Sequence, residues 1–479
     1  MKILFVNPPK VNGLSVIRED RCEITERVTT LPPYSILQMA AILRKQSYNI
    51  DLIDANGANI SYKDLQKKME SISFDILIFR FTPTTFREDI KVATLAKSIS
   101  KNIFTVGLCW TLKIFAKKII NDVDTIDFYV KGDYITTIPE LVNAINNGED
   151  LRKVPGIVYR KDNDIIETCD AHTDFNYDDL PIPAYDLLPS LNNYFVNTRY
   201  GTPYTIIYSS KGCPYKCIYC TVSETKWMAR SAENILKEIR YLKKKYNLKS
   251  LTFFDETFTY DRDRVIDICH KLIDEKLDIF WYCNTRSNKI DLELLKLMKN
   301  AGCRGMSLGI ESGSQKILNN ARKGITVEQH GRAISNAKLA GIKTYCSFIF
   351  GLPGENKSTI NETIKFIRKN LPNGGQFNVV VPYPGTKLFD IAIEKGWISP
   401  EIDWTKLFQH NSIMRTDDLS IEELDNARQM AYKSLYFNPR WILMNFLWVL
   451  KYPNDLILAT KFYLKSIENY MLHDMEHSH

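Results

Sequence analysis

Three cysteines with short spacing are the strongest chemical feature of the sequence. Cys213, Cys217 and Cys220 lie in the segment KGCPYKCIYC, with three and then two residues between them. Three thiolates on one short loop can bind three irons of a four-iron, four-sulfur (4Fe-4S) cluster, which leaves the fourth iron open. A structural zinc site requires four ligands, and no second cysteine pair or histidine follows at the usual spacing. Inert buried thiols are the other alternative, but three thiols on so short a loop favour the cluster.

An iron with an open position can bind the amino and carboxylate groups of S-adenosylmethionine (SAM). An electron passed to the sulfonium then breaks a carbon–sulfur bond, and the resulting deoxyadenosyl radical needs a dry, enclosed site to act on a substrate. Tyr219 directly precedes the last cysteine, so we expect its ring to lie against this cofactor. The cysteine loop therefore predicts a metal site that generates a radical.

The cysteine loop follows the first of six apolar strand segments that alternate with amphipathic helical segments. This alternation predicts parallel strands covered by helices, in the form of a partial (β/α)6 barrel over residues 196–400. Functional groups in such sheets gather at the carboxyl ends of the strands. The six strand segments begin at Thr205, Ser250, Asp278, Gly305, Lys343 and Gln376.

The CxxxCxxC loop resembles that of radical SAM enzymes. Over about residues 1–450, the layout of the chain resembles the subfamily with an N-terminal cobalamin-binding domain, which includes class B radical methyltransferases and anaerobic cyclases. The resemblance implies that Asp255 and Glu256, after the second strand, meet the methionine end of SAM, where carboxylates can accept hydrogen bonds from its ammonium group. A helix N-cap followed by a solvated carboxylate is the alternative for this pair.

Three later strand ends complete the set of segments that the resemblance assigns to SAM. Arg286, after the third strand, is expected to meet the SAM carboxylate. Glu311 ends the fourth strand and is expected to contact the ribose or the amino group, since a carboxylate after an apolar strand must be paired or exposed. Gly351 and Pro353, in the segment FGLPGE, resemble the loop whose backbone reads the adenine. Each segment alone predicts only a turn, but their order on successive strands makes the set specific.

Residues 1–150 show an earlier alternation of strands and helices, which predicts a doubly wound parallel sheet. The resemblance implies that this domain binds cobalamin at its strand ends. All seven histidines lie at or after position 172, so cobalamin would bind without a histidine ligand from this domain. The strands are expected at Lys2–Asn7, Asn49–Asp54, Asp75–Phe79, Asn102–Val106 and Asp127–Lys131. The helices are expected at Tyr34–Arg44, Tyr62–Ile72, Phe86–Ile99, Thr111–Ile120 and Ile135–Asn146.

Two loops of this first domain depart from the family pattern. The loop after the fourth strand contains Gly107-Leu-Cys-Trp110, where the family has smaller residues, and Arg80-Phe81 after the third strand is bulky. Both changes could fill the space of the corrin ring. Two interpretations therefore stay open: a cobalamin-binding domain, and a domain that has no cofactor and only packs.

The remaining segments are a predicted linker and a predicted helical tail. Residues 151–195 are rich in Asp and Pro and are expected to form a linker with a small hairpin. Residues 401–479 are expected to be helical. The apolar run Trp441–Leu450 is shorter than the ~20 residues that span a bilayer. Its aromatic residues, including Trp448, suit a helix that lies on a membrane surface and indicate a lipid-like substrate.

The composition narrows the classes of partner and location. The chain has 63 Lys and Arg against 56 Asp and Glu, a net charge of +7 without a basic run, which argues against nucleic acid as the main partner. No signal peptide opens the chain, so we expect a cytoplasmic protein, with membrane association through its tail as a further hypothesis. In that reducing compartment ten cysteines do not predict a disulfide framework.

The leading hypothesis is a cobalamin-dependent methyltransferase that acts on an unactivated carbon of a small hydrophobic or natural-product substrate. A deoxyadenosyl radical would remove hydrogen from the substrate, a second SAM would recharge the cobalamin, and an external electron donor would reduce the cluster. A radical cyclase or rearrangement enzyme without methyl transfer is the first alternative. A non-catalytic iron-sulfur sensor or scaffold is an alternative of another class.

Overall fold

The structure is a computed structural model, and it divides the chain into two compact units. Unit 1 comprises Met1–Val196 and Asp403–Leu407, and unit 2 comprises Asn197–Ile402 and the residues from Phe408 onward. The residues that the structure describes are 1–19, 25–26, 29–162, 164–171, 175–196, 200–409 and 413–451.

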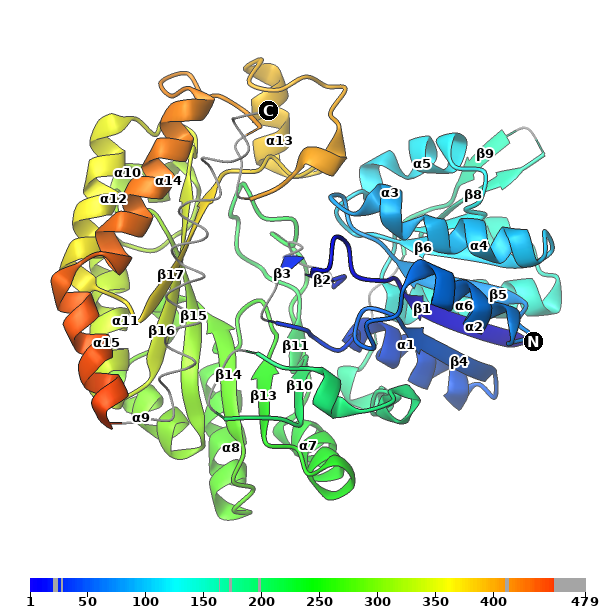
Figure 1. Cartoon of the computed structure of the whole chain (residues 1–479), viewed down its shortest axis with the longest axis horizontal. Coiled ribbons are helices and arrows are strands. Elements are labelled where there is room, and N and C mark those ends of the chain that lie inside the picture. The colour runs from blue at the N-terminus through cyan, green and yellow to red at the C-terminus, as the bar shows by residue number, and fades with distance from the viewer. Residues whose placement is uncertain are drawn as a thin grey trace. The chain divides into compact units, whose positions relative to one another are not determined.

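Unit 1 is built on one seven-stranded sheet with the strand order β4-β1-β5-β6-β7-β8-β9 (Figure 1). The first five strands in this order are parallel, and β8 and β9 add an antiparallel hairpin at the edge. The strands are β1 (Lys2–Asn7), β4 (Asn49–Asp54), β5 (Ile76–Arg80), β6 (Phe104–Leu108), β7 (Phe128–Val130), β8 (Ile157–Lys161) and β9 (Asp164–Glu167). A separate short pair is formed by β2 (Ser15–Val16) and β3 (Thr25–Glu26).

Helices cover both faces of this sheet, because its strands are apolar on both sides. One core joins the sheet to α1 and α6, and a second core joins the other face to α2, α4 and α5. The predicted doubly wound fold is therefore confirmed. The helices are α1 (Tyr34–Lys45), α2 (Tyr62–Glu70), α3 (Phe86–Asp89), α4 (Lys91–Ile99), α5 (Ala116–Asp122) and α6 (Tyr134–Asn147).

Two segments outside residues 1–150 belong to unit 1. The predicted linker contributes β8 and β9, because its alternating residues continue the sheet beyond β7. The segment Asp403–Leu407 joins this unit through Trp404, whose ring lies 5.6 Å from that of Phe86 and 5.2 Å from that of Phe115. The compact unit is thus larger than the domain drawn from the sequence.

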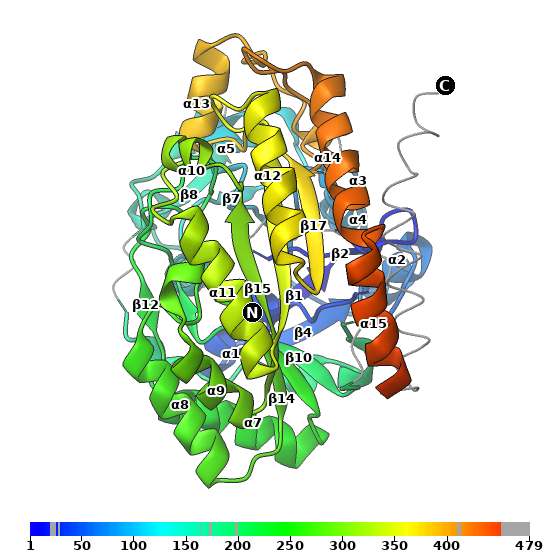
Figure 2. The ribbon, with the colours of Figure 1, turned by 90° about the vertical axis from the view of Figure 1, so that its left-hand side faces the viewer.

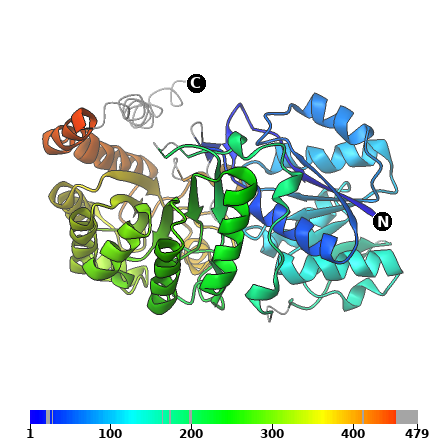
Figure 3. The ribbon, with the colours of Figure 1, turned by 90° about the horizontal axis from the view of Figure 1, so that it is seen from below.

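Unit 2 is built on six parallel strands in sequential order, β10-β13-β14-β15-β16-β17. The helices that connect them lie along one side of the strands, green to yellow in Figure 3. This is the predicted partial (β/α)6 barrel. Its strands are β10 (Tyr204–Ile207), β13 (Ser250–Phe253), β14 (Phe280–Thr285), β15 (Cys303–Glu311), β16 (Lys343–Phe350) and β17 (Gly374–Val379), and β11 (Ser210–Lys211) pairs with β12 (Met228–Ala229).

Each connecting helix of unit 2 carries an apolar stripe toward the sheet, and most begin at a side-chain cap. In α11, for example, Thr326 and Gln329 form a capping box, which satisfies backbone N–H groups of the first turn. The helices are α7 (Ala232–Tyr246), α8 (Arg262–Asp274), α9 (Leu292–Asn300), α10 (Gln315–Asn320), α11 (Val327–Ala340), α12 (Lys357–Asn370), α13 (Lys387–Glu394), α14 (Ile421–Tyr436) and α15 (Pro439–Lys451).

The two faces of the barrel strands differ in exposure. In β16, Cys346 and Phe348 are fully buried, while Tyr345 and Ser347 retain partial exposure. The same alternation runs through β14. Because successive side chains of a strand point to opposite faces, one face packs under the helices and the other remains accessible.

The helical tail packs on unit 2 beside the last strand. Helix α14 lies against α12 and β17, and α15 continues from it (Figure 2). The expectation that Trp441 faces a membrane is wrong: this side chain is only 4% exposed, its Nε1 donates to the carbonyl oxygen of Pro372 at 3.0 Å, and its ring packs edge-on against Tyr436. The side chain of Trp448 lies outside the described residues. Within the described part of the chain, no helix has the length and hydropathy needed to cross a bilayer.

Candidate functional site

The cysteine loop leaves the end of β10 and is closed by its own hydrogen bonds. The N–H of Cys213 donates to Thr225 Oγ1 at 2.9 Å, and the N–H of Thr225 donates back to the carbonyl of Cys213 at 3.1 Å. Gly212 opens the loop with a φ of +89°, and a methyl group at this position would lie 2.0 Å from the carbonyl oxygen of Lys226. Only glycine fits this turn, which therefore fixes where the three cysteines begin.

The three thiols differ in exposure but share one loop. Cys217 is buried, whereas Cys213 and Cys220 are partly exposed. Burial raises the pKa of Cys213, and the neighbouring Cys217 raises it further. Among the described residues, no three His, Cys, Asp or Glu side chains form a preformed site for a single metal ion. A cluster-binding loop differs from such a site because each cysteine binds a different iron.

Arg286 brings a positive charge to the cysteine loop, directly after β14. Its Nη1 lies 3.7 Å from Cys217 Sγ, and its guanidinium stacks over the ring of Tyr215 at 3.6 Å. Only 5% of this residue is exposed, and its buried Nε meets no acceptor in the part of the chain described. A buried N–H without a partner is costly. Arg286 therefore fits an anionic group beside the cysteines, such as the carboxylate of SAM.

Glu311 lies at the end of β15 and forms a buried ion pair that the sequence did not predict. Its Oε1 accepts from Lys323 Nζ at 2.7 Å, and Lys323 Nζ also lies 3.4 Å from the hydroxyl of Tyr219. Removal of Tyr219 from water raises its pKa, and the charges of Glu311, Cys217 and Cys220 raise it further. Tyr219 thus lies between the cysteine loop and the Glu311–Lys323 pair.

Asp255 and Glu256 occupy different environments at the end of β13. The carboxylate of Asp255 accepts from the N–H of Ser209 and the hydroxyl of Ser210, each at 2.7 Å, and Arg264 lies 3.7 Å away. These contacts tie the ends of β10 and β13 together. After burial, the charge of Glu256 is one of the influences that raise the pKa of Cys213. The predicted SAM contact of Asp255 stays a prediction.

The Gly351 loop ends β16 in a conformation that only glycine adopts readily. Gly351 has a φ of +96°, and a methyl group there would lie 2.8 Å from Val380. Its N–H donates to Glu355, whose pKa is raised by burial to about 8 and whose Oε1 has no hydrogen-bond partner in the described residues. The carbonyl of Pro353 accepts from Asn320 at 2.9 Å. The adenine contact of this loop stays a prediction.

Sequence reasoning gave no role to Lys323, and it included Glu355 only as the last residue of the segment FGLPGE. Both are charged residues that are nearly fully buried, and charged residues are rarely buried without a specific partner. The one available signal was a Gly beside each, in the segments RKG and PGE. That signal predicts a turn and says nothing about what the charged side chain contacts.

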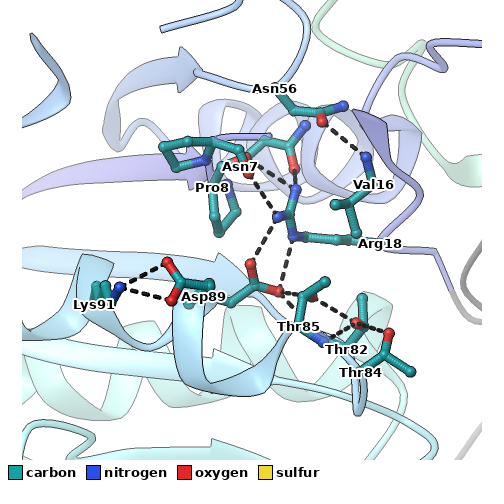
Figure 4. A network of polar contacts seen from close by, with 12 residues as sticks. Asn7, Pro8, Val16, Arg18, Asn56, Thr82, Thr84, Thr85, Asp89 and Lys91 are labelled. Atoms are coloured by element: carbon teal, nitrogen blue, oxygen red, sulfur yellow. Dashed lines mark hydrogen bonds and ion pairs between the residues drawn. The ribbon is translucent and has the colours of Figure 1, made fainter. Parts of the chain in front are cut away.

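The strand ends of unit 1 hold a buried polar network around Arg18 (Figure 4). The Arg18 guanidinium forms a bidentate ion pair with Asp89, with distances of 2.7 and 3.0 Å. It also donates to the carbonyls of Pro8 and Pro9, and to Asn7 at the end of β1. This network ties the loop after β1 to the end of β5, where a doubly wound sheet has its switch point.

Phe81, one of the two bulky departures in unit 1, does not lie free at the strand ends. Its side chain is 2% exposed and packs edge-on against Phe86 and Tyr129 in the core shared with α4 and α5. A methyl group at Gly107 would lie 2.9 Å from the Phe81 ring. Gly107, on β6, thus leaves room for Phe81, which follows β5, and the Phe81 ring points into the core.

Comparisons with known proteins agree with this geometry. Residues 207–367 match the family model described as the Radical SAM superfamily. An uncharacterized methyltransferase of Pyrococcus horikoshii is 30% identical over 446 residues, which cover 92% of this chain and 94% of that protein. An anaerobic magnesium-protoporphyrin IX monomethyl ester cyclase of Rubrivivax gelatinosus is 26% identical over 92% of this chain and 78% of its own length.

Among solved structures, the cobalamin-dependent SAM radical enzyme OxsB, with aqua-cobalamin and SAM bound, has a similar fold. Its TM-score is 0.73 at 17% identity, over 99% of this chain and 76% of that one. The radical SAM match covers the strands that carry the cysteine loop, Arg286 and Glu311, and the Pyrococcus relative extends the likeness over nearly the whole chain. This chain therefore belongs to the radical SAM enzyme superfamily.

Proposed function

We propose that this enzyme is a cobalamin-dependent radical SAM methyltransferase that acts on an unactivated carbon of a small hydrophobic or natural-product substrate. The observation that carries the proposal is the combination, in one chain, of the cysteine loop with its buried arginine and a doubly wound unit whose bulky Phe81 is turned into the core. The 30% identical relative is named a methyltransferase, and OxsB is described with cobalamin and SAM. These likenesses support the proposal.

In this proposal the 4Fe-4S cluster is held by Cys213, Cys217 and Cys220, and when bound it supplies the electron that cleaves SAM. Arg286 brings its positive charge within 3.7 Å of Cys217 Sγ, and its unsatisfied Nε can donate to the SAM carboxylate. Tyr219 and Glu311 lie close together, since both contact the ammonium of Lys323.

The loops that follow β6 and β7 in unit 1 would hold the cobalamin, which when bound supplies the methyl group. From the sequence, Phe81 could have filled the space of the corrin ring. In the structure its ring instead lies in the core beside Gly107. Trp110 on the β6 loop is partly exposed, and the ammonium of Lys113 lies 3.7 Å from its ring centre. All seven histidines lie at or after position 172, so residues 1–150 supply no histidine ligand and other groups of these loops would hold the corrin.

The test begins with anaerobic purification, cluster reconstitution and addition of cobalamin. The proposal predicts corrin absorbance that stays with the protein through gel filtration, and transfer of a labelled methyl group from SAM to an extracted hydrophobic substrate. A chain that retains its cluster and cleaves SAM but binds no cobalamin would contradict methyl transfer.

A radical cyclase is the second candidate function, favoured by the likeness to the Rubrivivax cyclase over 92% of this chain. The same assay separates the two candidates. A cyclase consumes SAM and converts the substrate without incorporating the methyl label. The sensor or scaffold alternative predicts no SAM cleavage above background, in contrast to the enzyme family to which the chain belongs.

Electron supply and location complete the proposal. We infer that an external one-electron donor reduces the cluster and that the protein works in the cytoplasm, with contact to a membrane surface through α15. Five large apolar side chains of α15 are more than 40% exposed, at the spacing of a single helix face: Ile442, Leu443, Phe446, Leu447 and Leu450. Helix α15 has no acidic residue, and the exposed Arg440 stands at its start. An apolar face with basic flanks suits a surface of anionic lipid.

Co-sedimentation with vesicles tests the membrane contact. Vesicles rich in phosphatidylglycerol should sediment the wild type, and the double variant Leu443→Ser/Phe446→Ser should stay in the supernatant. Met430→Ser is the matched control, since Met430 is an exposed apolar residue of α14. Equal sedimentation of all three proteins, or none at all, would contradict a lipid-binding role for α15.

A further inference from the structure

One face of the last two barrel strands carries polar side chains to which the proposed chemistry gives no task. This face comprises Tyr345 and Ser347 on β16, and Gln376 and Asn378 on β17, and we call these four residues the β16–β17 face. The strand register places Ser347 directly beside Gln376. Because every second residue of a strand points to the same side, the four side chains share one side of the sheet.

The opposite side of the same two strands is filled by the protein core. The rings of Phe348 and Phe377 stack with their centres 5.3 Å apart, and Phe377 also packs edge-on against Tyr432 of α14. The residues that alternate with these phenylalanines therefore point away from α14. The β16–β17 face is thus the side of the sheet that faces away from this helix, and core packing does not explain its polar residues.

Asn378 is a buried amide with an unused hydrogen-bond acceptor. Only 6% of the residue is exposed, and its Oδ1 meets no donor among the residues that the structure describes. The side chains of Ser347 and Gln376 are partly exposed and likewise have no hydrogen-bond partner in the described part of the chain. A buried acceptor without a donor costs free energy. A ligand that donates a hydrogen bond to Asn378 would remove this cost.

The side chains of the β16–β17 face suit a neutral group on a planar ring. Two amides, one aliphatic hydroxyl and one phenol offer donors and acceptors but no charge, and the charged residue on the same side of β16, Lys343, is exposed at the start of the strand. Tyr345 is 38% exposed, and its register partner Gly374 has no side chain to cover the ring. An exposed aromatic ring packs well against a second ring.

We propose that the β16–β17 face is a substrate subsite of this enzyme and that it takes a neutral carboxamide or lactam group carried on an apolar ring. Asn378 accepts a hydrogen bond from the N–H of this group, Gln376 and Ser347 bind its carbonyl end, and the ring lies on Tyr345. These residues determine specificity and take no part in the radical step. The inference rests on the proposed function, because it names the substrate class of the proposed methyltransferase.

The experiment measures the binding of benzamide, benzoate and toluene by saturation-transfer difference NMR on anaerobically reconstituted full-length protein with SAM. The variants are Asn378→Leu and Gln376→Leu, and Asn426→Leu, at an exposed residue of α14, is the matched control. Wild type and control should bind benzamide more tightly than benzoate or toluene. Asn378→Leu and Gln376→Leu should each bind benzamide roughly 5- to 10-fold more weakly, as for the loss of one hydrogen bond, with toluene binding unchanged.

The unfolding temperature separates this role from a purely structural one. Leucine in place of an unsatisfied buried amide should leave the Tm of Asn378→Leu unchanged or raise it, whereas loss of a structural hydrogen bond would lower it.

Three results would overturn the inference: a wild type without preference for benzamide over the other two probes, wild-type benzamide binding in Asn378→Leu, or a lowered Tm in that variant. A wild type that binds benzamide as expected but transfers no methyl group from SAM would instead refute the proposed function, and this outcome is distinct from all three.

Discussion

Replacing Arg18 by Met should destabilise unit 1, because it leaves Asp89 as a buried carboxylate without a counter-charge. Asp89 is fully buried, and the lost guanidinium is 5% exposed. Removing one partner of a buried ion pair costs about 3–5 kcal/mol. Thr82 N–H and Thr85 Oγ1 still donate to Asp89, which places the expected loss near the lower end, at about 3 kcal/mol. For a unit of this size that loss corresponds to a fall of roughly 6–12 °C in Tm.

The loss of stability caused by Arg18→Met should also grow as the pH rises. Burial raises the pKa of Asp89, and Arg18 is the largest influence that lowers it. An acid whose folded-state pKa lies above its unfolded-state value loses stability as pH rises toward the folded-state pKa. Removing Arg18 raises the folded-state pKa further, so the difference between variant and wild type should widen from pH 5 to pH 8.

Urea unfolding at several pH values, followed by hydrogen exchange in β1 and β5, isolates unit 1 in the full chain. Arg44→Met is the matched control, because Arg44 pairs with Asp186 at 2.8 Å on the surface and should cost less than about 1 kcal/mol. The double variant Arg18→Met/Asp89→Leu should recover much of the loss, since both charges are gone. A loss of stability in Arg18→Met no larger than that in Arg44→Met would contradict a stabilising Arg18–Asp89 pair, as would a double variant less stable than the single one.

Further predictions concern other buried groups. Burial raises the pKa of Glu355 to about 8, so between pH 5 and 8 the folded state keeps a proton that the unfolded state has lost. The free energy of unfolding should therefore fall by at most about 1.4 kcal/mol per pH unit in this range. In urea titrations Glu355→Gln should flatten this slope, and an unchanged slope would contradict the raised pKa of Glu355. Phe81→Ala should lower the free energy of unfolding of unit 1 by about 3–5 kcal/mol. Phe104→Ala should lower it far less, because Phe104 is 41% exposed. Similar losses in the two variants would argue against the packing of Phe81 beside Gly107. Trp441→Ala should expose α15 to hydrogen exchange because it removes the buried anchor, and full protection in this variant would show that other contacts hold the helix.

The regular part of both sheets could be predicted because its signal is local. The strands β1 and β4 have the predicted bounds, since each has apolar residues between polar residues at its two ends. The end of β5 lies one residue later than predicted, at Arg80, a charged residue that the fold buries. In a sequence, a charged residue normally indicates that a buried strand has ended. Only tertiary contacts can bury such a residue within the strand.

The helix predicted over Phe86–Ile99 is divided in the structure into α3 and α4. Asp89, at the junction, turns inward to pair with Arg18, 71 residues earlier in the chain. Helical periodicity places an Asp outward and carries no information on such a partner. The same limit explains the error on Trp441, because an apolar segment does not reveal which of its faces packs against the protein.

The candidate site also combines residues that the sequence predicts with a residue that only the fold brings to them. The family resemblance implied that Arg286 and Glu311 lie near the cysteine loop that contains Tyr219, and in the structure these residues lie close together. Lys323 completes this group through a turn twelve residues after Glu311, a relation set by the path of α10 rather than by any periodic pattern. Pairing of distant charged groups is thus the part of the site that only the fold supplies.

The proposed chemistry depends on three thiolates that hold one four-iron cluster with a position open for SAM. This arrangement can be tested by iron, sulfide and zinc analysis of anaerobically reconstituted protein, followed by electron paramagnetic resonance of the reduced sample before and after SAM addition. We expect equal iron and sulfide at the stoichiometry of one 4Fe-4S cluster, a signal that shifts when SAM is added, and loss of the cluster and its signal in Cys217→Ala. Stoichiometric zinc in place of iron, or a cluster signal that SAM leaves unchanged, would contradict it.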